Sequence, residues 1–522
     1  MTPAKRSIFV TTDGTNLMFT FILVSSLFLL WGICNGMIDV MDKHFQEELG
    51  LTKSQSAWVQ FAHYLGYFLM SMPAGWLASK LGYKGGIITG LLIVALGGFW
   101  FIPATHIAAF WAFLAGVCVI ASGLTFLETV ANPYTTVLGD PQYAATRINL
   151  AQSCNGFGWI FGPIIGGRFF YSKDAAGVST GSQTLYIPYV AVAVVVLVIA
   201  VIFYFANVPD IKTEDDYHLD DADADTEAAI PERQVNRGLV YSLLWLNSAV
   251  LIFACGMILW VILSTAGANE KLVNTTFRIG GGVLLLAAGV LLAPVAKQIS
   301  HHSVWSHPHF SGAVLAQFFY VAAQAGIFSF FINYMTSELP PIPASWATGI
   351  MKDWFEIGKD GFLHISDQGA SYLAPIGFSF FLAGRFSGSA ILRKYSAHKV
   401  LGLYGLINVL ACLLVFFKFG WISVAGVFIS YFFMSVMFPT IFALGIFGLG
   451  ARAKKASAFI VMAIMGGAIL PKLMGHVADI SDMSRGFIVP LFCFGLVALY
   501  GFNWPRFSGA ESLRSVRAGA GH

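Results

Sequence analysis

The stretch FLETVANPYTTVLGDPQYAATRINLAQSCN, residues 126–155, joins two long apolar runs and carries polar groups at the end of each. Glu128 stands near the end of the first run, and Gln152 and Asn155 open the second. A carboxylate at membrane depth costs roughly 2.5–3.5 kcal/mol on insertion scales, and such groups face a cavity or a partner. We therefore predict that Glu128 is a protonatable relay beside a polar substrate. A structural carboxylate, hydrogen-bonded between helices, is the alternative.

The composition is that of a polytopic membrane protein. Of the 522 residues, 57% are hydrophobic and 11% are charged, whereas soluble domains contain about 25% charged residues. The net charge of +3 gives no indication of a nucleic-acid partner, and we expect membrane lipid around the chain. The six cysteines lie within apolar runs and form neither a disulfide framework nor a CxxC metal motif. We expect no metal and no cofactor. An enzyme is disfavoured because no nucleophile–base pair or metal cluster recurs at one depth.

Apolar runs long enough to cross the hydrocarbon as helices recur along the chain. Their centres fall near residues 28, 67, 95, 119, 160, 195, 252, 287, 322, 381, 408, 433, 465 and 495. The pattern predicts fourteen transmembrane helices, and an even number places both termini on one side. Most lysines and arginines then fall on the side of the N-terminus, so the positive-inside rule predicts that both termini are cytoplasmic.

Internal repeats indicate the architecture. PAGWLASKLGYKGGIITGLL (73–92) resembles FSGSAILRKYSAHKVLGLYG (386–405), and RINLAQSCNGFGWIFGPIIGG (147–167) matches KASAFIVMAIMGGAILPKLMG (455–475) without a gap. Chance similarity of apolar sequence is the alternative, and the matched prolines, glycines and basic residues disfavour it. Two homologous six-helix halves are typical of the major facilitator architecture. We predict an all-α polytopic membrane protein of this fold, with an inserted two-helix hairpin between the halves.

The predicted division of the chain follows these repeats. It comprises an N-terminal six-helix half, an acidic cytoplasmic linker, an inserted transmembrane hairpin with its linker, a C-terminal six-helix half and a cytoplasmic tail, at residues 1–206, 207–239, 240–305, 306–505 and 506–522. Low hydrophobicity and like charge predict that the acidic linker is disordered. The hairpin is expected to face lipid. The insertion 338–366 is expected to lie outside, either as an interfacial helix over the entrance or as a plain loop.

Seven motifs together resemble those of the L-fucose:proton symporter family. They are WGICNGMID (31–39), FLETVANPYTTVLG (126–139), RINLAQSCNGFG (147–158), AVLAQFFYVAAQ (313–324), GRFSG (384–388), FPTIFALGIFGLG (438–450) and SAFIVMAIMGGAI (457–469). The resemblance implies a proton-coupled sugar importer of the bacterial inner membrane. It implies that Asp39 works in sugar binding and proton coupling and that Glu128 is the main proton carrier. Members differ in their sugar. The chain departs from the pattern at Gly36, where the fucose pattern has a second Asn, and at Lys472, a charge beside Pro471.

Spacing places polar side chains on common faces. Asn35 and Trp31 lie four and eight residues before Asp39 on the first helix, and Gln152 and Asn155 share a face of a later one. Amides, a carboxylate and an indole suit a sugar, whose hydroxyls need donors and acceptors and whose C–H face stacks on aromatic rings. A solvated boundary acid is the alternative for Asp39.

The second half offers a comparable face around residue 322. It consists of Gln317, Tyr320 and Gln324. Ordinary hydrogen bonding between helices is the alternative for such amides. Arg385 is the only basic residue well inside a predicted span and is expected to snorkel to the interface.

GWLASKLGYK (75–84) has the outline of the loop between the second and third helices of major facilitators, with a serine where the usual acid stands. We predict a conformational role for Gly75, Lys80 and Lys84, and for Arg393, the counterpart of Lys80 in the repeat. These cations would hold helix ends through the helix dipole and interhelical contacts.

The sequence thus predicts a proton-coupled symporter that imports a neutral monosaccharide, of the fucose, galactose or glucose type, by alternating access as a monomer. A sugar-binding membrane sensor or receptor on the same fold is one alternative, and an exporter of another small molecule is the other. The identity of the sugar and the use of sodium in place of the proton stay open.

Overall fold

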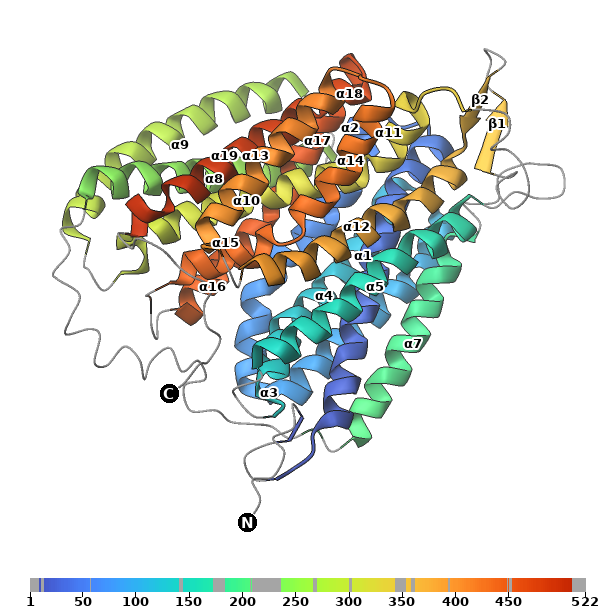
Figure 1. The fold of residues 1–522 in the computed structure, drawn as a ribbon, viewed down its shortest axis with the longest axis horizontal. Helices are drawn as coiled ribbons and strands as arrows, with labels where there is room; N and C mark the ends of the chain where they lie inside the picture. Colours follow the sequence, from blue (N-terminus) through green and yellow to red (C-terminus); the bar gives the residue numbers. More distant parts are fainter. Residues whose placement is uncertain are drawn as a thin grey trace.

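The structure is a computed structural model, and its helices run roughly along one direction, from lower left to upper right (Figure 1). It describes residues 9–10, 14–56, 58–139, 144–171, 184–206, 208, 236–265, 270–299, 303–342, 354–357, 362–392, 395–447, 449 and 453–508. Most of the predicted acidic linker and all of the tail beyond residue 508 lie outside these residues, so the predictions about them stay predictions.

The N-terminal half, coloured blue to green in Figure 1, consists of α1 Met18–Glu48, α2 Lys53–Ser56, α3 Trp58–Ile107, α4 Phe110–Val137, α5 Ala144–Phe170 and α7 Tyr186–Phe205. α3 contains two of the predicted spans. They meet at Gly82, where the backbone leaves the helical region with φ 70° and ψ −178°. Glycine adopts a positive φ without steric cost, which suits it to this junction.

Glycines bring α1 and α5 into close contact. A Cβ atom on Gly158 would lie 2.7 Å from Cα of Gly32, and one on Gly162 would lie 2.7 Å from Cα of Gly36. Small residues let the backbones of membrane helices approach in this way. The departure at Gly36 from the fucose pattern thus has a physical reason, because a Cβ there would lie 2.9 Å from Cδ of Pro163.

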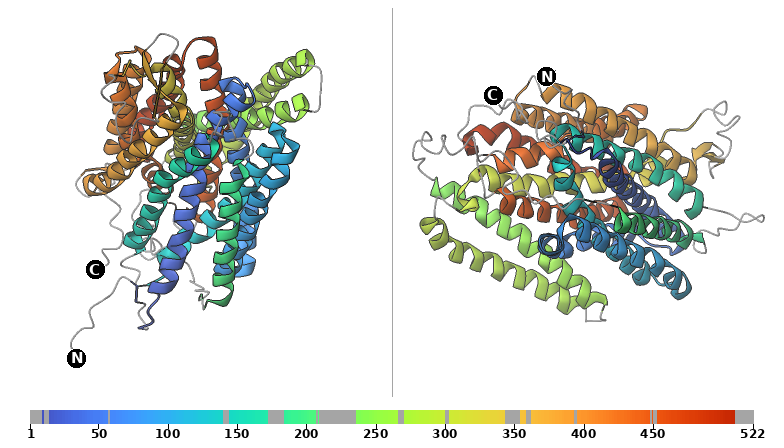
Figure 2. Two further views of the ribbon diagram at one scale, coloured as in Figure 1. Left: turned by 90° about the vertical axis from the view of Figure 1, so that its right-hand side faces the viewer. Right: turned by 90° about the horizontal axis from the view of Figure 1, so that it is seen from below.

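The inserted hairpin is formed by α8 Arg237–Thr265 and α9 Glu270–Gln298 and lies on one flank of the bundle (Figures 1 and 2). α8 packs on the C-terminal half, where Nδ2 of Asn247 donates a hydrogen bond to the backbone oxygen of Ser311 at 3.1 Å. In the 18-residue apolar segment of each helix, 6% of the residues are buried in α9 and 78% are buried in α10. α9 therefore presents nearly all of its apolar surface outward, as a lipid-facing helix does.

The C-terminal half, coloured yellow to red, begins with η2 Val304–Ser306, α10 Pro308–Ser329 and α11 Phe331–Glu338. It continues with α12 Asp367–Leu392, α13 Ala397–Phe416, α14 Trp421–Met434, α15 Met437–Ile446, α16 Ala453–Met462, η6 Ala463–Met465, α17 Gly466–Ile480, α18 Met483–Gly486 and α19 Ile488–Ser508. The two halves meet where α12 packs on α5, α1 on α10, and α17 on α2 and α3.

The described part of the 338–366 insertion contains two short strands. Residues 343–353 and 358–361 lie outside the described residues, so the expected interfacial helix stays a prediction. Strands β1 Phe355–Ile357 and β2 Leu363–Ile365 pair antiparallel, with Glu356 opposite His364. β-Branched and aromatic residues in these short segments favour strands over a helix.

Eleven helices of the described chain are long and apolar enough to cross a membrane. The other three predicted spans fall on the first arm of α3, on α5 and on α12, which are helical but do not meet that criterion. The count of fourteen therefore stays a prediction.

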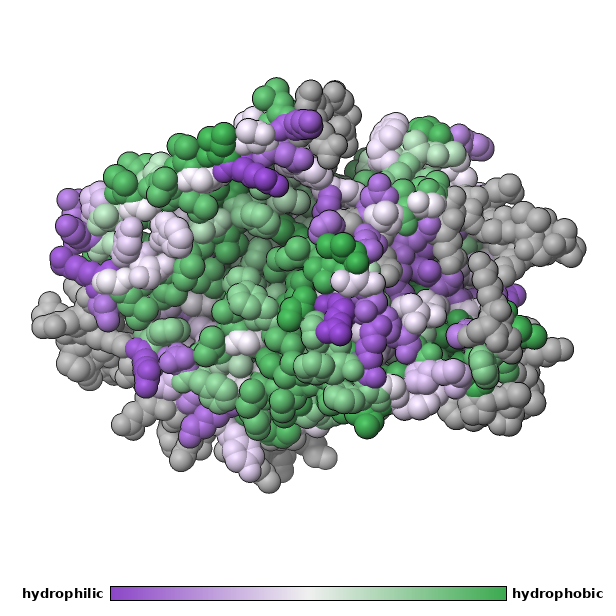
Figure 3. All heavy atoms as spheres, turned by 90° about the horizontal axis from the view of Figure 1, so that it is seen from above, coloured by the Kyte–Doolittle hydropathy of each residue, from purple (hydrophilic) through white to green (hydrophobic). Residues whose placement is uncertain are grey.

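Seen from above, a broad hydrophobic area covers the left and centre of the molecule, and hydrophilic side chains gather at its left edge and right of centre (Figure 3).

Candidate functional site

A hydrogen bond between Trp31 and Tyr67 joins α1 to the first arm of α3. Nε1 of Trp31 donates to the hydroxyl oxygen of Tyr67. The side chains of Asn35 and of Glu128 on α4 interact electrostatically with the same hydroxyl. Tyr67 is 5% exposed. The structure thus brings Glu128 together with Trp31 and Asn35, which the sequence had placed on one face of the first helix, and Tyr67 is the residue through which they meet.

The close contact of α1 with α5 adds a second amide. Asn155 is buried near Gly32, whose Cβ would lie 2.2 Å from the backbone oxygen of Asn155. Within the described part of the chain, Nδ2 of Asn155 and Oδ1 of Asn35 are buried without a hydrogen-bond partner. Gln152 is half-buried one turn earlier on α5. The side chain of Asp39 lies outside the described residues, so its predicted role stays a prediction.

The predicted polar face of α10 consists of Gln317, Tyr320 and Gln324, and these three side chains have different surroundings. Gln317 is fully buried, and neither its Oε1 nor its Nε2 has a partner among the residues that the structure describes. The hydroxyl of Tyr320 donates to the backbone oxygen of Met434 at 3.0 Å. Gln324 is half-buried.

The side chain of Arg385 on α12 is half-buried, and its expected snorkelling to the interface stays a prediction. Its Nε is buried, its guanidinium lies 5.0 Å from the ring centroid of Phe381, and it interacts with the Tyr320 hydroxyl. A cationic face on an aromatic ring and a nearby hydroxyl offset the desolvation of the guanidinium.

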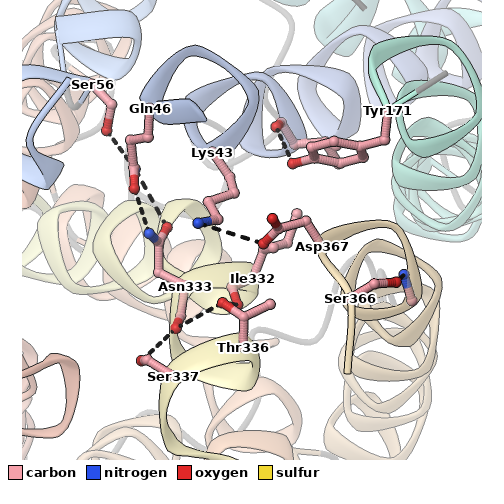
Figure 4. Close-up of polar contacts among 12 residues, drawn as sticks. Lys43, Gln46, Ser56, Tyr171, Ile332, Asn333, Thr336, Ser337, Ser366 and Asp367 are labelled. Atoms are coloured by element: carbon pink, nitrogen blue, oxygen red, sulfur yellow. Dashed lines mark hydrogen bonds and ion pairs between the residues drawn. The ribbon is translucent and has the colours of Figure 1, made fainter. Parts of the chain in front are cut away.

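Polar contacts join the two halves at one end of the bundle, the end that the sequence predicts to be the outer one (Figure 4). Nζ of Lys43 on α1 lies 3.5 Å from Oδ1 of Asp367 at the start of α12. Nδ2 of Asn333 on α11 donates to Oε1 of Gln46 at 2.5 Å, and Nε2 of Gln46 donates to Oγ of Ser56 at 2.7 Å. We call this the bridged end. The sequence analysis missed it, because no pattern relates these residues.

A second contact between the halves includes the hairpin. Nζ of Lys472 on α17 lies 3.1 Å from the ring centroid of Trp58 on α3 and 4.6 Å from that of Trp260 on α8. The two indoles stack with centroids 6.0 Å apart, and Nε1 of Trp260 donates to Oδ1 of Asn274 at 2.8 Å. We call Lys472, Trp58 and Trp260 the cation–π cluster. The sequence analysis had predicted that Arg385 is the only basic residue well inside a span. Lys472 also lies inside a span, within Phe459–Ile480, so that prediction was wrong.

Among the described residues, no group of three or more His, Cys, Asp or Glu is placed to hold a metal ion. The groups that the structure gathers at the site are an indole, a phenol, amides and one carboxylate. This set offers hydrogen-bond donors and acceptors, an aromatic face and one proton-accepting oxygen.

Comparison with known proteins gives the family. The sequence model of the Major Facilitator Superfamily matches residues 17–351. The chain belongs to this superfamily. It is 30% identical to the L-fucose-proton symporter of Escherichia coli K12 over 497 residues, which cover 92% of each chain. It is 26% identical to a glucose/galactose transporter of Brucella abortus over 492 residues, which cover 94% of this chain and 95% of that one.

A solved structure supports the same assignment within the major facilitator superfamily. The crystal structure of the Major Facilitator Superfamily transporter FucP in the outward conformation matches with a TM-score of 0.57 and 28% identity, over 94% of this chain and 99% of that one. Together with the relatives, it shows that the resemblance to the L-fucose:proton symporter family was correct.

In the segment 75–84, which has the outline of the loop between the second and third helices of major facilitators, one lysine makes the expected contact with a helix end. Nζ of Lys84 donates to the backbone oxygen of Ala206 at the end of α7 at 2.9 Å, and a lysine stabilises a helix C-terminus in this way. Nζ of Lys80 lies 4.0 Å from the ring centroid of Trp76. The side chain of Arg393 and the surroundings of Gly75 lie outside the described residues. A conformational role for the loop stays a prediction.

Proposed function

We propose that this protein is a proton-coupled symporter that imports a neutral monosaccharide across a bacterial inner membrane by alternating access. The observation that carries the proposal is the meeting of Trp31, Asn35 and Glu128 at the Tyr67 hydroxyl, which puts sugar-recognising groups beside a carboxylate. The named relatives support a sugar as the substrate, and their different sugars leave open which one is carried.

Sugar binding is assigned to the unpartnered amides. A buried polar group without a partner destabilises a protein by about 1–3 kcal/mol. Within the described chain, the buried polar atoms without a partner include Oδ1 of Asn35, Nδ2 of Asn155 and both polar side-chain atoms of Gln317. Sugar hydroxyls would supply the missing partners, and the indole of Trp31 would stack on the C–H face of the ring. Gln152, Tyr320, Gln324 and Asp39 complete the proposed site.

Proton coupling is assigned to Glu128, with Asp39 linking protonation to sugar binding. Glu128 keeps some exposed surface although it lies within a helix of the bundle. When the transporter closes around its substrate, Glu128 becomes less hydrated. The closed state then has a lower free energy when Glu128 is protonated, because burying a charged carboxylate costs more than burying a neutral one. Proton and sugar would therefore cross together, and release of the proton on the other side would reset the carrier.

Alternating access is supported by the bridged end. The contacts of Lys43 with Asp367 and of Gln46 with Asn333 hold the halves together there. Because we place both termini in the cytoplasm, this end would face outward, and these contacts would belong to a state closed to the outside. The FucP crystal structure is in the outward conformation. Opening to the outside would require these contacts to separate.

Uptake by proteoliposomes tests the proposal. Vesicles that contain the full chain are given labelled fucose, galactose, glucose and other neutral monosaccharides, with or without an imposed inward proton gradient. We expect at least one sugar to accumulate above its external concentration, and a protonophore to abolish the accumulation. A sodium gradient at constant pH is the control for the coupling ion. Sugar binding without uptake under every gradient would contradict the proposal and indicate a sensor.

A further inference from the structure

Tyr67 lies where the proposed sugar site meets the proposed proton carrier. Its hydroxyl is the only atom of the described structure to which Trp31, Asn35 and Glu128 are all related. It is 5% exposed. Tyr67 belongs to none of the sequence motifs, and the spacing of residues on α1 gave no sign of it.

The hydrogen-bond capacity of this hydroxyl sets its orientation. Its oxygen accepts from Nε1 of Trp31. The side chain of Asn35 lies close enough to interact with the same hydroxyl. A hydroxyl has two acceptor sites and one proton. Because its oxygen accepts from the Trp31 N–H, its O–H points away from Trp31.

The remaining neighbours determine where that O–H dipole is stabilised. His63 and Tyr64 on α3 have ring centroids 5.1 Å and 6.4 Å from that of Tyr67, and Glu128 faces it from α4. The side chain of Asp39 on α1 lies outside the described residues. Nδ1 of His63 is buried without a partner among the described residues and is a second candidate acceptor. Of these described titratable groups, only Glu128 becomes anionic near neutral pH, so an O–H directed towards it stabilises its ionised form.

We propose that Tyr67 is a positioning residue with two effects, since its oxygen orients Trp31 and Asn35 for sugar binding and its O–H dipole stabilises ionised Glu128. This inference rests on the proposed symport and adds a residue that links its two parts. One hydroxyl then affects both sugar affinity and the pH range of coupled uptake. A residue that only packs the helices would affect neither of them specifically.

The variant Tyr67→Phe keeps the ring and removes the hydroxyl. We expect the sugar KM in exchange to rise about tenfold, because the Trp31 N–H loses its acceptor, with little change in the maximal exchange rate. The pH at which proton-driven uptake falls to half should move upward, because Glu128 retains its proton to a higher pH. In a Glu128→Gln background, Tyr67→Phe should still raise KM but should have no effect on pH dependence.

Two further variants keep the test decisive. Tyr189→Phe removes another buried hydroxyl of the same half, one that contacts Sδ of Met41 at 3.3 Å, and should leave KM and the pH profile unchanged. Trp31→Phe removes the donor, and its effect on KM should be less than additive with that of Tyr67→Phe. A Tyr67→Phe protein with KM within twofold of wild type and an unmoved pH profile overturns the inference. If the wild-type protein accumulates no sugar, the proposed function fails instead.

Discussion

Nζ of Lys472 lies 3.1 Å from the ring centroid of Trp58, which places a cation of the C-terminal half directly on an aromatic ring of the N-terminal half. The second indole, Trp260, comes from the inserted hairpin. Three parts of the chain that are remote in sequence therefore share one cation. A partly desolvated cation–π contact contributes about 0.5–2 kcal/mol. The hairpin is thus attached at the junction of the two halves and not only to the outside of one.

Replacing Trp260 by Leu should weaken this attachment. The Lys472 cation loses one of its two rings, and the Trp58 ring loses its stacking partner. We expect the apparent unfolding temperature of the purified protein in detergent to fall by a few degrees. Trp111→Leu removes a tryptophan that is 59% exposed and serves as the matched control. Equal unfolding temperatures for the two variants would show that the cation–π cluster contributes no stability.

The bridged end should open more readily when Lys43 is replaced by Met. This change leaves Asp367 without its cation, so the state closed at this end loses up to about 1 kcal/mol. Cysteines at positions 46 and 333 report on closure through cross-linking by a short bifunctional reagent, after Cys118, Cys154 and Cys255 have been replaced by Ala. We expect lower cross-linking yield with Lys43→Met.

A charge exchange provides the control for this contact. The double variant Lys43→Asp with Asp367→Lys restores an ion pair of opposite polarity and should recover much of the cross-linking. Yields that do not differ among the wild type, the single variant and the exchange would show that the ion pair has no part in closing this end.

Glu128 and Asp39 should have different functions. Glu128→Gln mimics the protonated acid, so uphill uptake should vanish while sugar exchange, which needs no deprotonation, survives with nearly unchanged affinity. Asp39→Asn should alter both the sugar affinity and its pH dependence. Isothermal titration of both purified variants from about pH 5.5 to 8.5, combined with uptake, measures the difference. Uphill accumulation at the normal rate in Glu128→Gln would remove its assignment as proton carrier.

The amides of the proposed sugar site should each carry measurable binding energy. Asn35→Ala, Gln152→Ala, Asn155→Ala and Gln317→Ala leave sugar hydroxyls without partners, at about 1–3 kcal/mol each, which is roughly ten- to hundredfold in affinity. Asn408→Ala is the matched control, because Asn408 is also buried and without a hydrogen-bond partner among the described residues but lies on α13, which packs on α14 and α19. If the site variants all bind within twofold of wild type, the sugar binds elsewhere.

The sequence by itself determined the fold class and named part of the proposed site. Long apolar runs specify helices because a spanning segment must satisfy its backbone groups internally. The repeat of matched prolines, glycines and cations indicated two related halves. Spacing placed Trp31 and Asn35 on one face of α1, and the cost of a carboxylate in an apolar run marked Glu128.

Only the tertiary structure decided which faces meet. Helical periodicity shows which residues share a face but not which helix that face contacts, so Tyr67, 36 residues from Trp31 in the chain, could not be found from spacing. The same limit hid Lys43 and Asp367, and Trp58, Trp260 and Lys472. The pairing of β1 with β2 in the described part of the 338–366 insertion also depends on context, because the pairing of such short strands is set by contacts beyond their own sequence.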